Sequence, residues 1–448
     1  MDMSVEMISE EISLKEGRVY FLGIGGSGMY GVARLAHAMG LSVTGSDAKE
    51  NHNTARLRAL GIPLCGEGEP LQADICVVVY SLAVSSEHPR LAEARERGLK
   101  IYHRAQFFGL LEGSFPIRAA VAGSHGKSST TAMCAQILTV AGRSPTVVSG
   151  ASLTLGGDSF REGEGDILLY EACEYRDAFL SLHPTHALVL NASWEHTDYF
   201  ADRESVIHSF SSFLTGNSVS CGIAPQGEFP CGVTFGNCGK YTAESRVERK
   251  EGSEFLLARE GASVGKVTLS VPGGYQIENA LGAAALCSSL GVSDADIVKG
   301  LCAYRGIPRR MEKRGTLRGV PLYLDFAHHP KELLYALKTA ARFGRPLAVV
   351  FEPHTYSRTR EFFDDYVRAL RMPHIAGVLP IYAAREQNDG SVSSVLLARE
   401  AGVAFLADYM HAARFLTRAA GKGCTLLLIG AGGVEGVLAH LPFLCPAR

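Results

Sequence analysis

Short apolar runs alternate along this chain with longer segments in which apolar and polar residues recur at helical spacing. Runs of this kind occupy residues 18–24, 73–80, 167–172, 186–193, 322–328, 346–353 and 424–433. They are nearly continuous in Val, Ile and Leu, a pattern typical of strands whose two faces are both covered by helices. We therefore predict an α/β fold built on mostly parallel sheets.

Two breaks in this pattern suggest how the chain is divided. At 448 residues it exceeds the roughly 250–300 residues at which a single core stops growing. One break follows the strand-like LKIYHRA, within residues 104–116, and the other lies at YRGIPRR, near residues 304–309. We predict three α/β domains in series, at residues 1–106, 107–307 and 308–448.

The stretch 215–275 of the middle domain differs from its surroundings because it is rich in glycine. It contains strand-like pieces such as GVTFG and SEFLLARE. We predict that these pieces pair as antiparallel strands and form a small β-appendage.

Composition and charge narrow the possible classes of protein. Hydrophobic residues make up 46% and charged residues 20%, and the formal charge of −2 offers no basic field for nucleic acid. No apolar run approaches the ~18–20 residues of a membrane span. The N-terminus is acidic without an apolar signal core, and the eleven cysteines form no CxxC pair. We expect a cytoplasmic protein with reduced thiols that binds neither nucleic acid nor membrane.

Residues 117–133, IRAAVAGSHGKSSTTAM, have the layout of a phosphate-binding loop. An apolar strand ends at Gly123, turns, and enters a helix-like stretch at Lys127-Ser128. Backbone N–H groups in such a turn face an anion, the lysine reaches the β- and γ-phosphates, and the serine hydroxyl ligates Mg²⁺. The usual pattern has glycine where Val121 stands, so the loop would be a shortened form. The alternative is a glycine-rich turn with a surface lysine.

A second glycine loop, GIGGSGM, follows the first predicted strand. Gly23, Gly25 and Gly28 satisfy G-x-G-x-x-G, and Asp47 follows about 20 residues later, where a dinucleotide-binding fold places a carboxylate on a ribose. The motif indicates a diphosphate ligand more firmly than it indicates NAD. A tight turn without any ligand is the alternative.

Polar residues follow two strands of the middle domain. Glu171 ends one strand and is placed to face Mg²⁺ beside Ser128, because ligands of open α/β sheets lie at the carboxyl ends of strands. His196 follows the next strand and could ligate a second metal or orient a phosphate. A solvated carboxylate and a structural histidine are the corresponding alternatives.

The last predicted domain has polar residues at two strand ends. Arg310 lies at the domain break, and Asp325 ends a strand directly before His328 and His329. The segment 351–360, FEPHTYSRTR, ends another strand. Crowded histidines and arginines at both ends indicate a site for an anionic small molecule.

Together these motifs resemble those of the Mur ligase family, in order and over essentially the whole chain. They are GIGGSGM, GSHGKSSTT, EACEYR, NASWEHTDYF, RRME, LDFAHHP and EPHTYSRTR. The resemblance implies an N-terminal Rossmann-like UDP-sugar domain, a central P-loop ATPase domain and a C-terminal Rossmann-like amino-acid domain. It also assigns the first glycine loop to the UDP diphosphate, and the family's short ATP loop accounts for Val121.

The reaction implied by the resemblance is ATP-dependent amide formation in peptidoglycan precursor synthesis. The carboxylate of UDP-N-acetylmuramate attacks the γ-phosphate of ATP and gives an acyl phosphate, which the amino group of L-alanine then attacks. Mg²⁺ is the implied cofactor, and a monomer or homodimer is expected. Such an enzyme mainly positions groups and neutralises charge.

The resemblance also implies roles for individual residues. The catalytic set is Lys127, Glu171, His196, Arg310 and Asp325. The ATP set is Gly123, Ser124, His125, Gly126, Lys127, Ser128, Ser129, Asn279, Arg310 and Asp325. The UDP-sugar set is Gly23, Gly25, Gly26, Ser27, Gly28, Met29, Asp47 and Ser81. His328, His329 and Arg358 are assigned to the amino acid, and Ser128, Glu171 and His196 to metal. No lysine lies between residues 127 and 240, so we expect no carbamylated lysine.

The sequence departs from the family pattern at Gln276, Phe326, Thr355 and Glu195, where Asn, Tyr, Arg and Asp are usual. Phe326 and Thr355 touch the expected amino-acid pocket, so the acceptor is open. The alternatives are a ligase that recycles murein peptides onto the same sugar nucleotide, a non-catalytic paralogue that binds UDP-sugars, and a nicotinamide-dependent oxidoreductase.

Overall fold

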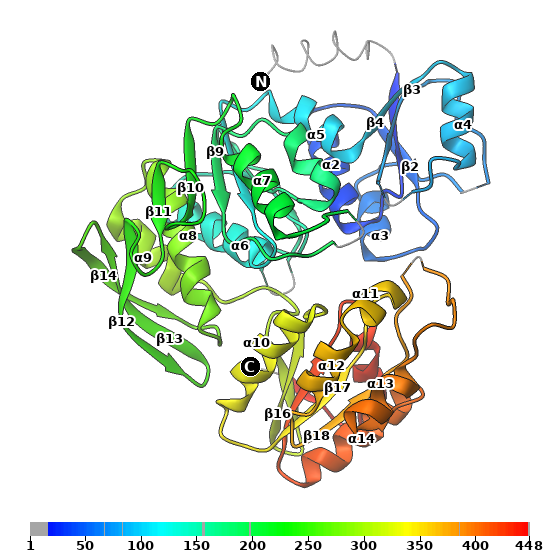
Figure 1. Cartoon of the computed structure of the whole chain (residues 1–448). Helices are drawn as coiled ribbons and strands as arrows, with labels where there is room; N and C mark the ends of the chain where they lie inside the picture. Colours follow the sequence, from blue (N-terminus) through cyan, green and yellow to red (C-terminus); the bar gives the residue numbers. More distant parts are fainter. Residues whose placement is uncertain are drawn as a thin grey trace. The chain divides into compact units, whose positions relative to one another are not determined.

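The computed structural model describes residues 17–66, 68–82, 84–154, 157–196, 199–384 and 386–446. These residues form three sheets flanked by helices, which confirms the predicted α/β class (Figure 1). The chain divides into two compact units. The first contains the chain up to Ser245 with residues 255–267 and 278–304, and the second contains residues 246–254, 268–277 and 305 onward.

The first sheet is fully parallel, with strand order β2-β1-β3-β4. Its strands are β1 (Arg18–Leu22), β2 (Val43–Ser46), β3 (Ile75–Tyr80) and β4 (Lys100–His103). Its helices are α2 (Ser27–Ala38), α3 (His52–Ala59), α4 (Pro89–Glu96) and α5 (Arg104–Glu112). Val19 and Phe21 of β1 enter one hydrophobic core, while Tyr20 and Leu22 enter another. Both faces of β1 are therefore buried, as its continuous apolar sequence predicts.

The central sheet has ten strands in the order β14-β13-β12-β11-β10-β9-β5-β8-β6-β7. The strands nearest the phosphate loop are β5 (Ile117–Ala122), β6 (Thr146–Val148), β7 (Phe160–Arg161), β8 (Ile167–Glu171) and β9 (His186–Val189). They are followed by β10 (Cys221–Pro225), β11 (Val233–Phe235), β12 (Tyr241–Arg249), β13 (Gly252–Arg259) and β14 (Ala262–Leu269). Strand β5 runs parallel to both β8 and β9. Its carboxyl end therefore meets the ends of both neighbours.

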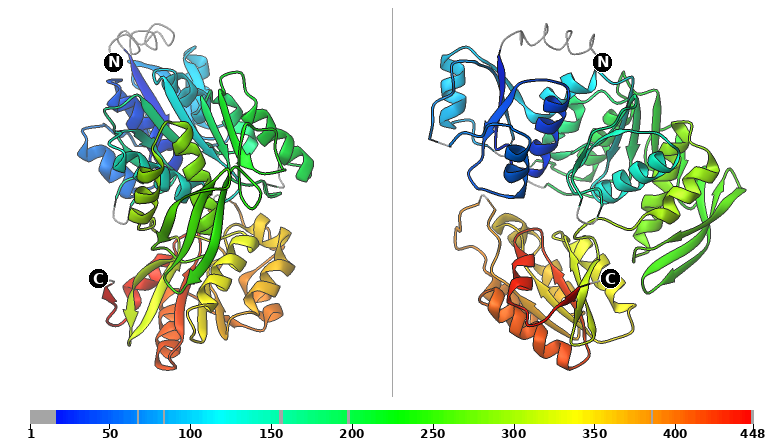
Figure 2. Two further views of the ribbon diagram at one scale, coloured as in Figure 1. Left: turned by 90° about the vertical axis from the view of Figure 1, so that its left-hand side faces the viewer. Right: turned by 180° about the vertical axis from the view of Figure 1, so that it is seen from behind.

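The helices around this sheet are α6 (Lys127–Val140), α7 (Arg203–Leu214), α8 (Tyr275–Ser289) and α9 (Asp294–Ala303), with a 3₁₀ segment η1 (Tyr175–Ser181). Figures 1 and 2 show α2 and α5 between the first sheet and the central sheet of this unit. Asp158, which precedes β7 of the central sheet, connects this sheet to the helices of the first sheet. Its carboxylate pairs with Arg34 of α2 at 3.0 Å and with Arg56 of α3 at 3.1 Å.

The predicted antiparallel pairing of GVTFG is wrong. Its strand, β11, runs parallel to β10 and is also parallel to β12 at its end. Residues 226–232 carry the chain back to the start of β10 instead of reversing it in a tight hairpin. The SEFLLARE segment does form a strand, β13, joined to β14 through Glu260 and Gly261. Both of these residues have positive φ, 53° and 79°, as in a type I′ hairpin turn.

The third sheet lies in the second unit and has the order β19-β18-β17-β20-β16-β15-β21. Its strands are β15 (Glu312–Leu317), β16 (Val320–Asp325), β17 (Leu347–Phe351), β18 (Ile375–Val378), β19 (Ala404–Phe405), β20 (Thr425–Ile429) and β21 (Cys445–Pro446). Strand β15 is antiparallel to β16 and to β21, and the pairs β16–β20, β20–β17, β17–β18 and β18–β19 are parallel.

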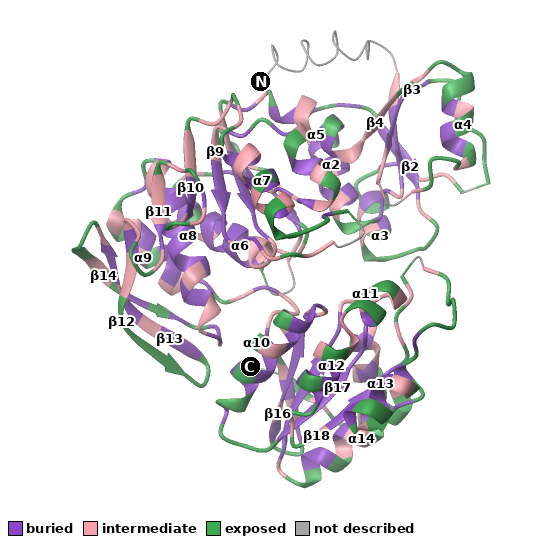
Figure 3. Ribbon diagram, in the orientation of Figure 1, coloured by how far each residue is buried: buried purple, intermediate pink, exposed green. Residues whose placement is uncertain are grey.

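Helices cover both faces of this sheet. They are α10 (Pro330–Ala341), α11 (Tyr356–Glu361), α12 (Phe363–Leu370), α13 (Ser394–Ala401) and α14 (Tyr409–Gly421), with a 3₁₀ segment η2 (Val434–His440). Side chains of α10, α12 and α13 share one core with Val349, and those of α14 share the other with Val350. Figure 3 shows the resulting buried strands between partly exposed helices. No helix within the described ranges is both long and apolar enough to cross a membrane.

Candidate active site

The phosphate loop connects β5 to α6, which confirms the strand–turn–helix layout that the sequence predicts. Gly123 and Gly126 have φ of 141° and 87°, values that favour glycine. A Cβ on Gly126 would lie 2.4 Å from Oδ1 of Asn279, so the absence of a side chain at Gly126 also lets α8 pack close to the loop. Helix α6 begins at Lys127 without any side-chain cap. Its first N–H groups therefore face the loop, as an anion site requires.

Lys127 is held inside the loop by an ion pair and two carbonyl oxygens. Its Nζ donates to the oxygens of Gly123 (2.5 Å) and Ser124 (3.3 Å) and to both carboxylate oxygens of Glu174 (2.9 and 3.1 Å). Burial works against both charges. The attraction between the two charges outweighs this effect of burial. It raises the pKa of Lys127 above its ordinary value and lowers that of Glu174 to about 2. Both groups are therefore charged at neutral pH.

Glu174 is a site residue that the sequence reasoning missed. Its side chain is only 5% exposed, and it also lies 3.8 Å from Nε2 of His196. The signal for it in the sequence is the spacing Glu-x-x-Glu in EACEYR after a buried strand, of which the first carboxylate alone belongs to the predicted metal set. Glu174 orients the lysine, which is a role that no motif position alone reveals.

Ser128 and Glu171 lie together, as predicted for a metal site. The Ser128 hydroxyl donates to Oε2 of Glu171 at 3.0 Å. The other oxygen, Oε1, accepts hydrogen bonds from the Ser149 hydroxyl and from the backbone N–H of Gly150. The hydrogen bonds to Oε1 therefore fix the carboxylate, and Oε2 faces the Ser128 hydroxyl. An oxygen pair of this kind suits a hard cation such as Mg²⁺.

His196 lies beside Glu174 and packs against Tyr175 with the two rings tilted by 48° and their centroids 4.8 Å apart. Its φ of 55° is unusual for a residue other than glycine. Among the described contacts His196 reaches Glu174 and not Glu171. Its place in the predicted metal set stays a prediction.

The residues after β9 line the other side of the phosphate loop. Asn191 accepts from the backbone N–H of His125 (2.9 Å) and donates to its carbonyl oxygen (3.0 Å). Glu195 pairs with His125 at 2.8 Å, and Ser124 donates to the carbonyl of Ser193. Ser129 is buried within α6. The segment that follows β9 therefore helps to set the loop's shape.

The first glycine loop, between β1 and α2, is shaped by Asp47. Its Oδ2 accepts the N–H of Gly25 at 2.8 Å, and Asn53 donates to the Gly25 carbonyl at 3.0 Å. The dinucleotide interpretation placed Asp47 on a ribose, whereas here the carboxylate fixes the loop itself. Met29 is buried, and Ser81 follows β3 at the same edge of the sheet.

The loop's remaining predicted members adjoin the start of α2. The N–H of Gly26 donates to the carbonyl of Gly23, and α2 begins at Ser27 with no side-chain cap. Gly28 lies in the first turn of α2. The structure therefore places the glycine-loop part of the predicted UDP-sugar set at one strand–helix junction.

In the second unit, Asp325 ends β16 and is buried. Its two oxygens accept the N–H groups of Met311 and Ala327, both at 2.8 Å. Burial raises its pKa to about 6, although the charge of Arg310 works in the opposite direction. Arg310 lies over the ring of Phe326, 5.2 Å from its centroid, and 3.6 Å from Glu332. Phe326 thus provides a cation–π platform for the arginine.

His328, His354 and Arg358 gather beyond the ends of β16 and β17. The rings of His328 and His354 lie 5.7 Å apart, and Nη1 of Arg358 is 3.1 Å from Nδ1 of His354. Burial lowers the pKa of both histidines, that of His354 to about 4. Both imidazoles are therefore neutral at pH 7 beside a fixed guanidinium.

His329 and Thr355 act at helix starts. His329 accepts the N–H of Lys331 and caps α10. Thr355 caps α11 by accepting the N–H of Arg358, and it has a φ of 68°. A β-branched residue rarely adopts such a φ, so its backbone is strained.

Models of one protein family match the chain in three segments. The Mur ligase family catalytic domain matches residues 18–115, the Mur ligase middle domain residues 121–287, and the Mur ligase glutamate ligase domain residues 309–432. The chain belongs to the Mur ligase family.

Individual members of the family resemble this Mur ligase over nearly its full length. The UDP-N-acetylmuramate–L-alanine ligase of Agathobacter rectalis is 33% identical over 93% of this chain and 95% of its own. The crystal structure of the UDP-N-acetylmuramate-alanine ligase of Thermotoga maritima is 25% identical, covers 94% of this chain and 97% of its own, and gives a TM-score of 0.79. A murein peptide ligase from Psychrobacter arcticus shares the fold at 23% identity, covering 95% and 98%, with a TM-score of 0.71.

The Lys127–Glu174 pair yields a prediction for activity and stability. We expect Lys127→Ala to lower ATP turnover by at least ~10²–10³-fold, the usual effect of losing one charge-stabilising group. It also leaves Glu174 buried without its partner, at a cost of about 3–5 kcal/mol. The double variant Lys127→Met/Glu174→Gln should recover most of the stability and none of the activity. Turnover assays and urea unfolding of the three proteins measure both effects, and wild-type turnover in Lys127→Ala would contradict the role of the loop.

The raised pKa of Asp325 yields a prediction for pH dependence. Between the ordinary value of about 3.9 and the folded value of about 6, the folded protein binds more protons at this group than the unfolded chain does. Its contribution to stability is therefore present at low pH and is lost as the pH rises through about 6. We expect Asp325→Asn to remove this part of the pH dependence of urea unfolding between pH 4 and 6. Parallel profiles for the variant and the wild type would show that Asp325 does not titrate in this range.

Proposed function

We propose that this Mur ligase uses ATP to join L-alanine to the carboxylate of UDP-N-acetylmuramate, through an acyl-phosphate intermediate. The observation that carries the chemistry is the phosphate loop with its partly buried lysine and its serine–carboxylate pair. The full-length similarity to proteins named UDP-N-acetylmuramate–L-alanine ligase supports the choice of substrates. The reaction would make the first peptide-type bond of peptidoglycan precursor synthesis.

The first half-reaction transfers the γ-phosphoryl group of ATP to the sugar's carboxylate. The amide N–H groups at the start of α6 and the Lys127 ammonium would bind the phosphates and offset charge that develops during transfer. Glu174 keeps this ammonium charged and aimed into the loop. The transfer turns an unreactive carboxylate into an acyl phosphate, whose phosphate is a good leaving group.

We assign a magnesium site to the oxygens of Ser128 and Glu171. When bound, Mg²⁺ would neutralise phosphate charge. The hydrogen bonds from Ser149 and Gly150 fix Oε1 of the carboxylate, which keeps its other oxygen in place. His196 is proposed to serve a second metal through its position beside Glu174.

The second half-reaction is the attack of the L-alanine amino group on the acyl carbon. The attacking amine must be neutral, so its ammonium has to lose a proton. The imidazoles of His328 and His354 are neutral at pH 7 and can accept a hydrogen bond from that amine, but their lowered pKa values make them weak bases for removing the proton itself. The Arg358 guanidinium is suited to pair with the amino acid's carboxylate. Thr355 supplies no second guanidinium, so we infer that Arg358 carries most of that recognition.

The competing functions have weaker support. The similarity to a murein peptide ligase is at 23% identity and speaks for the fold alone. The oxidoreductase interpretation leaves Lys127, Ser128 and Glu171 without a role, and it disagrees with membership of the family. A non-catalytic paralogue is disfavoured by the assembled lysine, serine and carboxylate groups.

We further propose that the functional domains follow the boundaries 1–106, 107–307 and 308–448. On this division the UDP-sugar, ATP and amino-acid groups come from successive segments. A cytoplasmic location, in which ATP is plentiful, fits this function, and we expect a monomer or homodimer.

One assay tests the proposed function. ADP release is measured from ATP and Mg²⁺ with UDP-N-acetylmuramate and, separately, L-alanine, L-serine, glycine or a murein tripeptide. We expect release with L-alanine and much less with the tripeptide. Release only with the tripeptide would favour the recycling ligase, and tight UDP-sugar binding without release would favour the non-catalytic paralogue. A reaction without the sugar nucleotide serves as the control.

A further inference from the structure

Arg104 occupies an unfavourable position for a cation. It is the first residue of α5, and the amino end of a helix carries partial positive charge. No acidic residue lies in the first turn of this helix. Within the described ranges the Arg104 guanidinium forms no hydrogen bond and no ion pair. Its charge is therefore not offset by the protein contacts that the structure describes.

Other partly buried arginines of the same unit are paired. Arg34 and Arg56 share the Asp158 carboxylate, and Arg161 donates to the hydroxyl of Thr139 at 3.0 Å. A partly buried guanidinium without such a partner loses hydration and gains nothing in return. Among the described residues Arg104 has neither a carboxylate partner, as Arg34 and Arg56 do, nor a neutral acceptor, as Arg161 does.

The Arg104 guanidinium lies against the first glycine loop. A Cβ on Gly28 would be 2.5 Å from its Nη1 and 3.0 Å from its Cζ. Gly28 does not have positive φ, and a side chain there would require the flexible guanidinium to move away from the loop. The Arg104 guanidinium therefore packs directly against the third glycine of the motif.

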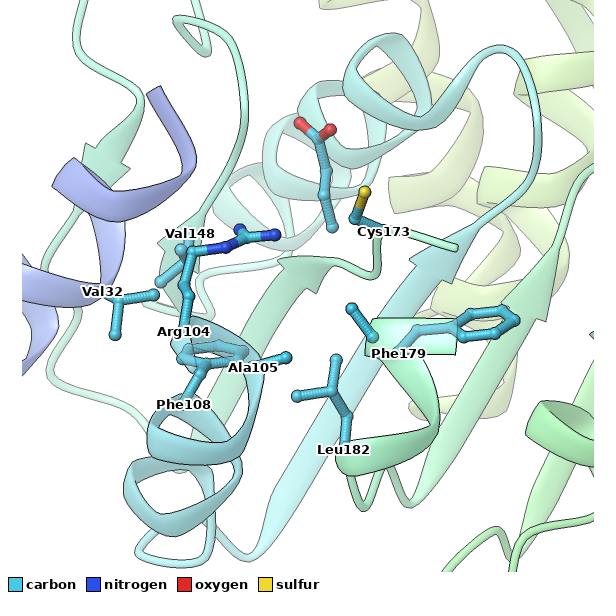
Figure 4. A pocket seen from close by; sticks show the side chains of 10 residues that line it. Val32, Arg104, Ala105, Phe108, Val148, Cys173, Phe179 and Leu182 are labelled. Atoms are coloured by element: carbon cyan, nitrogen blue, oxygen red, sulfur yellow. The ribbon is translucent and has the colours of Figure 1, made fainter. Parts of the chain in front are cut away.

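Arg104 also borders the site around Glu171. Together with Glu171 and Cys173 it lines a cavity whose other walls are mostly apolar, including Val32 and Phe108. Figure 4 shows the guanidinium extending away from Phe108 of its own helix toward the side on which Cys173 lies. Arg104 therefore lies between the glycine loop and the carboxylate assigned to Mg²⁺.

We propose that Arg104 binds the diphosphate of the sugar nucleotide. This inference rests on the proposed function, in which the first glycine loop holds that diphosphate. The flat guanidinium can donate two parallel hydrogen bonds to phosphate oxygens, and each is strengthened by charge. Bound phosphate would add negative charge at a helix start that is capped only by the neutral side chains of His103 and Gln106. Arg104 is thus a binding residue that the glycine motif does not reveal.

Binding of UDP and of UDP-N-acetylmuramate, measured by titration calorimetry, tests the proposal. We expect Arg104→Ala to weaken both ligands by about tenfold or more, since both carry the diphosphate. The affinity of Arg104→Lys should lie between those of the wild type and Arg104→Ala, because lysine keeps the charge without the planar pair of donors. The control Arg95→Ala removes the same charge from an exposed position on α4 and should bind as the wild type does.

Three results would overturn the proposal. Unchanged affinity of Arg104→Ala for both ligands would remove Arg104 from the site. A loss confined to UDP-N-acetylmuramate would assign Arg104 to the sugar's carboxylate and not to the diphosphate. A lower melting temperature of the unliganded variant with unchanged affinity would assign it a structural role. A wild-type protein that binds neither nucleotide would refute the proposed function as well, whereas the first three results leave it standing.

Discussion

The ion pair between the partly buried Lys127 and the buried Glu174 is the interaction on which the rest of the candidate site depends. Two opposite charges are held where burial would otherwise disfavour both, and the lysine also donates to the Gly123 and Ser124 carbonyls. These contacts close the loop around the ammonium group. The ammonium group is therefore held at the loop, and its hydrogen bonds to the two carbonyls are the contacts that phosphate oxygens would replace.

The carboxylate of Glu171 is positioned by a longer series of contacts within the first unit. Ser149 and Gly150 hold its Oε1 atom, and the same segment continues to Asp158, where Arg34 and Arg56 attach. The N–H of Ser149 bonds to the carbonyl of Ser159, which keeps the two ends of this segment together. The helices around the first sheet are thus anchored to the segment that orients the predicted metal ligand. The proposed sugar-nucleotide and metal groups are parts of one continuous packed unit.

Much of this architecture could be predicted from the sequence, because parallel strands buried on both faces appear as continuous apolar runs. The continuous apolar run of β1 and the glycine turn before Lys127 both gave the observed elements. The direction of β11 could not be predicted in this way, since a glycine-rich connection is compatible with either a hairpin or a return to the same end. Glu174 and Arg104 were missed because their importance arises from partners that are distant in sequence or absent from the protein. The role of Asp47 differed for a similar reason, since its partner is the backbone of Gly25.

The central claim is that the loop at Lys127 and the Ser128–Glu171 pair bind the phosphates of ATP together with a metal ion. The most direct measurement is a crystal structure with Mn²⁺ and a non-hydrolysable ATP analogue, in which anomalous scattering locates the metal. We expect a Mn²⁺ ion coordinated by the Ser128 hydroxyl and the Glu171 carboxylate, with Lys127 on the terminal phosphates and still paired to Glu174. A nucleotide bound elsewhere, or a metal that touches neither Ser128 nor Glu171, would contradict the claim.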